Sequence, residues 1–161
     1  MRVLYCLDGT NVKQFSQART MLAASETATL GILHVIDSGP REDLGRARER
    51  FLRKPGPPPL REEEIRQTEI ASAKEILEEG LQHFPGAEIL ERQGRPEREI
   101  VNGAAEWRAD LLVICPRAQY GGPPSLGPKS VGHVARFVLD HAPCPVLLVR
   151  PEAHEQFPIT R

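Results

Sequence analysis

Short apolar segments alternate along the chain with longer segments in which apolar residues recur at helical spacing. The first two apolar segments are closed by the turn-forming residues Asp8-Gly9 and Asp37-Ser38-Gly39-Pro40, which is typical of strands that run into turns. The segments predicted as strands are Arg2–Leu7, Leu30–Ile36, Ala87–Gln93, Asp110–Cys115 and Pro145–Val149. The segments predicted as helices are Val12–Ala24, a long helix from Arg61 to the Pro85-Gly86 stop, a helix opened by Gly94-Arg95-Pro96-Glu97, and a helix that starts at Ser130 as its N-cap.

Regular alternation of strands and helices predicts a single doubly wound α/β domain with a parallel sheet and helices on both faces. Asp110–Cys115 is almost continuously apolar, as in a strand covered on both faces, whereas Ala87–Gln93 alternates only in part, as an edge strand does. We assign residues 1–150 to this domain, with a Pro-rich insert at about 53–60, and residues 151–161 to a polar C-terminal tail.

Composition narrows the classes of partner. The 161 residues carry 21 Lys and Arg against 22 Asp and Glu, a net charge of -1 that favours neither nucleic acid nor an anionic membrane. The chain holds no apolar run near the roughly 20 residues of a membrane span, and its start turns polar too early for a secretory signal. Three cysteines, an odd number without metal-type spacing, indicate free thiols in a reducing compartment. We therefore expect a cytoplasmic protein.

Candidate chemistry gathers at the ends of the predicted strands, where doubly wound sheets bind their ligands. Asp8 follows the first strand, and its carboxylate either contacts a ligand or caps the Asp-Gly turn. His34 lies within an apolar strand without a nucleophile at motif spacing, so we interpret it as a satisfied, half-buried histidine. Asp37 is interpreted as a turn residue.

A long Gly- and Pro-rich loop, residues 114–132, joins the fourth predicted strand to the last helix. Lys129 and the start of the helix at Ser130 are suited to bind phosphate. Pro128 separates Gly127 from Lys129, however, so the loop does not have the P-loop pattern. The alternative is an inserted surface loop, stiffened by its prolines, in which Ser130 only caps the helix. Both interpretations stay open at this point.

Four segments together resemble the universal stress protein family: VLYCLDGT, LGILHVID, the Gly94-Arg95-Pro96 opening, and GHVARFVLDHAPCPVLLVR. The resemblance implies a five-stranded, flavodoxin-like or Rossmann-like sheet of strand order 3-2-1-4-5. It also implies a homodimer, commonly formed through the final strand, here Val146–Val149. Some members of this family bind ATP or AMP, others lack the site, and their roles lie in stress survival and signalling.

The resemblance implies that Asp8 contacts the nucleoside and that the backbone at Val35 reads the adenine edge. At the phosphate end the family's nucleotide-binding members carry Gly, two residues, Gly, nine residues, Gly, then Ser or Thr. In this chain the first two glycine positions hold Cys115 and Ala118, the spacing is about four residues longer, and only the last glycine is kept. That glycine is Gly132, and the hydroxyl position after it holds His133. The residues predicted to hold phosphate are Arg117, Lys129, Ser130, Gly132 and His133.

Two hypotheses follow. The first is a stress-response regulator that binds an adenine nucleotide, AMP or ATP, through a divergent site, with the role of Mg²⁺ left open. The second is a dimeric interaction module of the same fold that has lost the nucleotide and acts through an unidentified protein partner. No paired carboxylates, nucleophile motif or metal-ligand set stands out, so an enzyme is not predicted.

Overall fold

The computed structural model describes residues 1–22, 28–38, 59–116 and 131–150. The predicted strand and helix segments all appear there, with boundaries shifted by a few residues. The strands are β1 (Arg2–Leu7), β2 (Thr29–Asp37), β3 (Glu88–Gly94), β4 (Leu111–Ile114) and β5 (Val146–Leu148). The helices are α1 (Val12–Leu22), α3 (Pro59–His83), α4 (Pro96–Glu106) and α5 (His133–His141).

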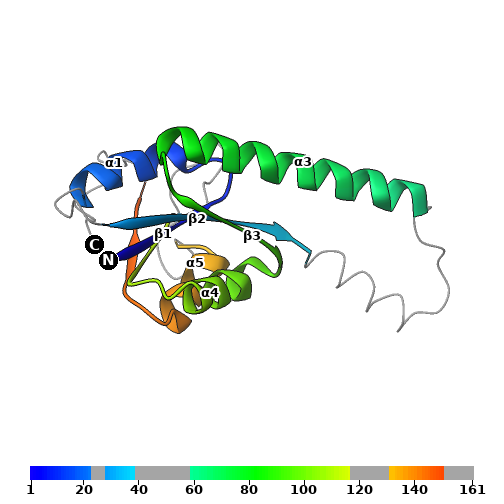
Figure 1. Ribbon diagram of the computed structural model, residues 1–161. Helices are drawn as coiled ribbons and strands as arrows, with labels where there is room; N and C mark the ends of the chain where they lie inside the picture. Colours follow the sequence, from blue (N-terminus) through cyan, green and yellow to red (C-terminus); the bar gives the residue numbers. More distant parts are fainter. Residues whose placement is uncertain (23–27, 39–58, 117–130, 151–161) are drawn as a thin grey trace, which may run out of the picture.

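The five strands form one parallel sheet of order β3-β2-β1-β4-β5. Figure 1 shows α1 and α3 along one face of the sheet and α4 and α5 along the other. The predicted fold class is therefore confirmed, including the place of β3 at an edge. The strand order reverses between β1 and β4, so the switch point of the sheet lies between the ends of these two strands, next to the end of β2.

Alternate residues of β1 enter two different cores, one on each face of the sheet. Leu4 and Cys6 pack with residues of α4 and α5, whereas Val3, Tyr5 and Leu7 pack with residues of α1 and α3. Because both faces are covered, the central strands have to be apolar along their whole length. This explains why β1 reads as a continuous apolar run rather than an alternating one.

Two helix starts differ from their predicted positions. The long helix begins at Pro59, inside the predicted Pro-rich insert, because proline is well tolerated in the first turn of a helix, where its missing N–H has no acceptor. The last helix begins at His133 with Gly132 as N-cap, so the prediction of a start at Ser130 is wrong. Gly132 has φ 83°, which is outside the helical region, and Val131 lies in a turn. The rest of the predicted insert, Ser130 itself and the tail lie outside the described residues.

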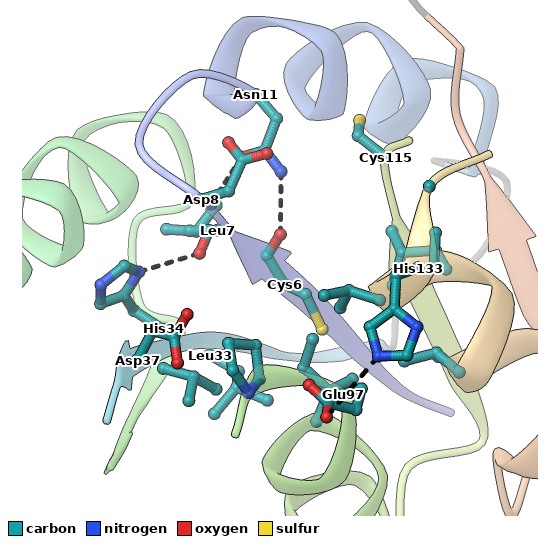
Figure 2. A pocket seen from close by; sticks show the side chains of 18 of the residues that line it. Cys6, Leu7, Asp8, Asn11, Leu33, His34, Asp37, Glu97, Cys115 and His133 are labelled. Atoms are coloured by element: carbon teal, nitrogen blue, oxygen red, sulfur yellow. Dashed lines mark hydrogen bonds and ion pairs between the residues drawn. The ribbon is translucent and has the colours of Figure 1, made fainter. Parts of the chain in front are cut away.

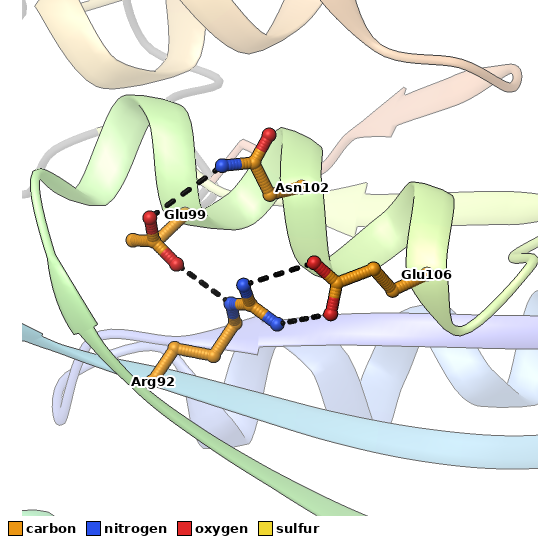
Figure 3. A network of polar contacts seen from close by, with 4 residues as sticks. All are labelled: Arg92, Glu99, Asn102 and Glu106. Carbon is orange, nitrogen blue, oxygen red and sulfur yellow. Dashed lines mark hydrogen bonds and ion pairs between the residues drawn. The ribbon is translucent and has the colours of Figure 1, made fainter.

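The edge strand β3 is joined to α4 by a cluster of charged side chains, which Figure 3 shows. The Arg92 Nε donates to Glu99 at 2.7 Å, and its two terminal nitrogens donate to the Glu106 carboxylate at 2.8 and 3.2 Å. Arg92 therefore uses three of its donors on one helix. The cluster fixes α4, and with it the start of that helix beside the ends of the central strands.

Candidate functional site

A pocket of about 670 Å³ lies at the carboxyl ends of β1, β2 and β4 and between the starts of α4 and α5. Its volume falls within the range of small-molecule sites. Figure 2 shows side chains from all of these elements around it. The residues that line it and matter to its chemistry are Cys6, Asp8, Asn11, His34, Val35, Asp37, Arg95, Glu97, Cys115, Gly132 and His133.

The turn after β1 is held together by Asp8 and Asn11. The Asp8 Oδ1 accepts hydrogen bonds from the backbone N–H and the hydroxyl of Thr10, at 2.8 and 2.9 Å. Asn11 is buried and bonded through both atoms of its amide: the amide nitrogen donates to the Cys6 carbonyl at 2.9 Å, and the Oδ1 accepts from the Asp8 N–H at 3.2 Å. Asp8 is exposed beside the pocket, and its Oδ2 has no partner within the described residues. The carboxylate therefore caps the turn and still offers one oxygen.

β2 continues past the end of β1. The last β1 residue, Leu7, lies opposite His34, so Val35 and the next two residues of β2 pair only with β3. In a parallel sheet alternate residues point their N–H and C=O groups toward each neighbouring strand. The end of β2 therefore presents main-chain donors and acceptors to the pocket on the side where β1 has ended.

The His34 ring bonds to the last residue of β1. Its Nδ1 lies 2.9 Å from the Leu7 carbonyl oxygen, and because a carbonyl only accepts, that nitrogen carries the hydrogen. The prediction of a satisfied, half-buried histidine is confirmed. Asp37, predicted as a turn residue, is instead the last residue of β2 and lies opposite Gly94 of β3. Strand pairing with β3 continues farther than the turn-like sequence indicated.

Two helix starts face the pocket from the other side. Neither the Arg95 N-cap of α4 nor the Gly132 N-cap of α5 provides a side-chain hydrogen bond to its helix. Gly132 has φ 83°, a conformation that disfavours any residue with a Cβ. Its neighbour His133 is exposed, and the His133 Nε2 lies 3.7 Å from the Glu97 Oε1 of α4 (Figure 2). This contact links the two helix starts across the pocket.

Two thiols line the pocket and both are held in the protonated form. Burial raises the pKa of the Cys115 thiol to about 12, with a smaller contribution from the Asp8 charge. Burial also raises the pKa of the Cys6 thiol, and the other two cysteines add to that shift. Neither thiol has the lowered pKa of a reactive nucleophile. They line the pocket as neutral thiols.

The structure brings together four of the predicted site residues, Asp8, Val35, Gly132 and His133, around one pocket. The other three, Arg117, Lys129 and Ser130, lie outside the described residues. Sequence reasoning did not assign Asn11, Asp37, Arg95 and Glu97 to the site. Arg95 and Glu97 could have been assigned to the site from the sequence, because they lie at a helix start directly after a strand. Such helix starts also lie at the carboxyl edge of the sheet.

A pocket at the switch point of a parallel sheet is where proteins of the doubly wound α/β class bind small ligands. The chain belongs to the universal stress protein family, whose sequence profile matches residues 1–150. A universal stress protein of Thermus aquaticus is 35% identical over 90 residues, which cover 55% of this chain. The match spans 63% of that relative, less than two thirds of its length.

Solved structures of the family have the same fold. The universal stress protein UspA from Lactobacillus plantarum aligns with a TM-score of 0.66 and 22% identity, over 93% of this chain and 97% of its own. A family protein from Arabidopsis thaliana, solved with AMP bound, aligns with a TM-score of 0.58 and 19% identity, over 97% and 95% of the two chains. A universal stress protein solved in complex with cAMP aligns with a TM-score of 0.51 and 20% identity, over 92% and 95%.

Two further findings concern the described residues alone. None of their helices is long and apolar enough to cross a membrane. Within the same ranges, no group of three or more His, Cys, Asp or Glu side chains is placed to hold a metal ion.

Proposed function

We propose that this protein is a cytoplasmic stress-response regulator that binds an adenine nucleotide in the pocket at the ends of β1, β2 and β4. The observation that carries the proposal is the convergence of Asp8, the free end of β2 and two helix starts on one cavity of about 670 Å³. The AMP and cAMP bound to proteins of the same fold support the choice of an adenine ligand. The three free cysteines fit a reducing compartment.

The adenosine end of the ligand would lie between Asp8 and Val35. Main-chain groups at the end of β2 supply a fixed donor and acceptor for the adenine edge, and the Asp8 Oδ2 supplies an acceptor for a ribose hydroxyl. Half-buried apolar side chains such as Val35 line the same space and give the purine a nonpolar surface. These are the features that a nucleoside requires.

The phosphate end would lie at the start of α5. Gly132 leaves its helix start without a side-chain cap, so the first N–H groups are available to an anion. His133 replaces the hydroxyl that the family pattern places there and adds an imidazole donor. Arg117, Lys129 and Ser130 are further phosphate partners that we predict from the sequence.

Calorimetric titration of the purified protein with AMP, cAMP and ATP tests this function. We expect saturable binding that weakens in Asp8→Ala and in Lys129→Ala, while exposed Lys74→Ala on α3 leaves it unchanged. Lys74 is a suitable control because it pairs with Glu78 on the outer surface of that helix. Flat titrations with all three ligands would overturn the proposal and leave the interaction module as the function of this fold.

We further propose that the protein is a homodimer that pairs through β5. This strand is at the edge of the sheet and has a neighbour only on the β4 side within the described chain. An edge strand presents unpaired main-chain groups that a second copy can complete. Val146–Val149 would form that contact. The pocket would lie away from the contact, because no residue of β5 lines it.

A further inference from the structure

We infer that Glu97 makes the pocket prefer adenine ligands with at most one phosphate over the triphosphate. This inference rests on the proposed nucleotide function and names the ligand class of the same site. It assigns a specificity-determining role to a residue that the family's phosphate pattern does not include.

Glu97 already places an anion next to the start of α5. Its side chain is only 13% exposed, it lines the pocket, and its Oε1 lies 3.7 Å from the His133 Nε2 at the first residue of that helix. Figure 2 shows the two side chains pointing toward each other below Cys6. The helix start that attracts phosphate therefore faces a carboxylate of the protein itself.

The pair also places a carboxylate beside the imidazole that replaced the family's hydroxyl. His133 is 78% exposed, and a protonated imidazole there is attracted to Glu97 before any ligand enters. When the imidazole is neutral, the Glu97 charge faces the pocket without that compensation. In both protonation states a phosphate at this helix start meets a competing negative charge.

Asp8 adds a further carboxylate to the described lining and acts in the same direction as Glu97. Asp37 and Arg95 also line the pocket, and each already has an interaction partner in the protein. Each additional phosphate brings more negative charge into this partly buried space, where charges interact more strongly than in water. An uncharged nucleoside meets none of this repulsion, and a monophosphate meets far less than a triphosphate.

The test compares adenosine, AMP and ATP by calorimetry at pH 8 without divalent cations. For the parent protein we expect ATP to bind at least about tenfold more weakly than AMP. Glu97→Gln should strengthen ATP binding by about tenfold and leave adenosine binding within about twofold. Glu75→Gln, which removes the same charge from an exposed site on α3, should change none of the three affinities.

The same role of Glu97 can be tested without a substitution, by titrating the parent protein with AMP and ATP at increasing salt concentrations. Raising the salt to about 0.5 M should narrow the gap between AMP and ATP, because mobile ions screen the repulsion. Equal affinities of the parent for AMP and ATP, or a Glu97→Gln effect as large on adenosine as on ATP, would overturn the role of Glu97 and leave the nucleotide function standing. The absence of binding by any adenine ligand would overturn the nucleotide function itself, and this inference with it.

Discussion

Asp8 uses its two carboxylate oxygens for different purposes. The Oδ1 accepts two hydrogen bonds from Thr10 and shapes the turn after β1, while the Oδ2 is available beside the pocket. The two alternatives considered from the sequence, a turn cap and a ligand contact, are therefore compatible in one side chain. They are separable because an asparagine keeps the first oxygen and replaces the second by a donor.

Asp8→Asn should weaken adenine-ligand binding but keep the unfolding free energy close to that of the parent. Asp8→Ala should lower both the affinity for the ligand and the unfolding free energy. We expect Asp8→Ala to cost about 1 kcal/mol, since it removes the acceptor that caps the turn. Urea unfolding and calorimetry on the two variants measure these effects. If Asp8→Asn binds the ligand as well as the parent does, Asp8 serves the turn alone.

Gly132 provides a second test at the residue scale, because a similar glycine lies elsewhere in the chain. Gly132 and Gly86 have φ of 83° and 80°. A Cβ at Gly86 meets no atom within 4 Å. Substitution by alanine should therefore cost about 1–3 kcal/mol of unfolding free energy at either position, because a positive φ disfavours a residue with a Cβ. Only Gly132→Ala should also weaken nucleotide binding in calorimetry. Equal, unchanged binding by both variants would remove Gly132 from the site.

At the scale of elements, the clearest connection is between β3 and α4. Arg92 binds Glu106 with two hydrogen bonds and Glu99 with one, and these bonds raise the pKa of Arg92. The hydrogen bonds from Arg92 also lower the pKa of the exposed Glu106 carboxyl below its ordinary value of 4.5. A carboxyl with a lowered folded pKa stabilises the fold above its unfolded pKa and loses that contribution as the pH falls through the folded value.

Glu106→Gln should therefore be less stable than the parent near neutral pH, and the difference should disappear as the pH falls below about 4.5 toward the lowered folded value. Urea unfolding across this pH range measures the effect. Glu91→Gln, at an exposed position of β3, is the matched control and should show no such difference. A gap between parent and Glu106→Gln that is the same at every pH would contradict the ionic origin of this contribution.

The order and type of the elements were predictable because the apolar pattern is local to each segment. β1 and β4 are continuously apolar since both of their faces are covered, and Pro85-Gly86 ends α3 as expected. The start of α5 was not predictable in the same way. Ser130 is a favourable N-cap residue, yet Gly132 takes that position with a backbone conformation that the sequence does not reveal.

The candidate site was predictable only where its residues directly follow a strand, as Asp8 does, or match a family position, as Val35 does. The Glu97–His133 contact joins residues 36 positions apart on α4 and α5, so no local sequence pattern indicates it. Asn11 is similar, because its importance comes from the buried carbonyl that it bonds. The role of such residues in the site can be recognised only from the folded structure, in which the sheet places these elements at one edge.

For the whole molecule, the sheet edge at β5, which has no further strand within the described residues, is separate from the pocket. Leu112 donates to the Pro145 carbonyl, and Val149 donates to the Ile114 carbonyl. Because main-chain groups alternate in direction along a parallel strand, Val146 and Leu148 point theirs away from β4. These are the groups that would pair with a second copy in the proposed dimer.

Val146→Pro should therefore convert the dimer to a monomer, because it removes one of the outward N–H donors and proline is tolerated at the first residue of an edge strand. Val146→Ala removes the packing of the side chain against the core but keeps the donor, so it should remain dimeric. Light scattering gives the mass of each variant, and circular dichroism verifies that both are folded. A folded Val146→Pro with the mass of the parent would place the dimer contact elsewhere. Because the pocket lies at the ends of β1, β2 and β4, away from β5, we expect the monomeric variant to bind the proposed adenine ligand as the parent does.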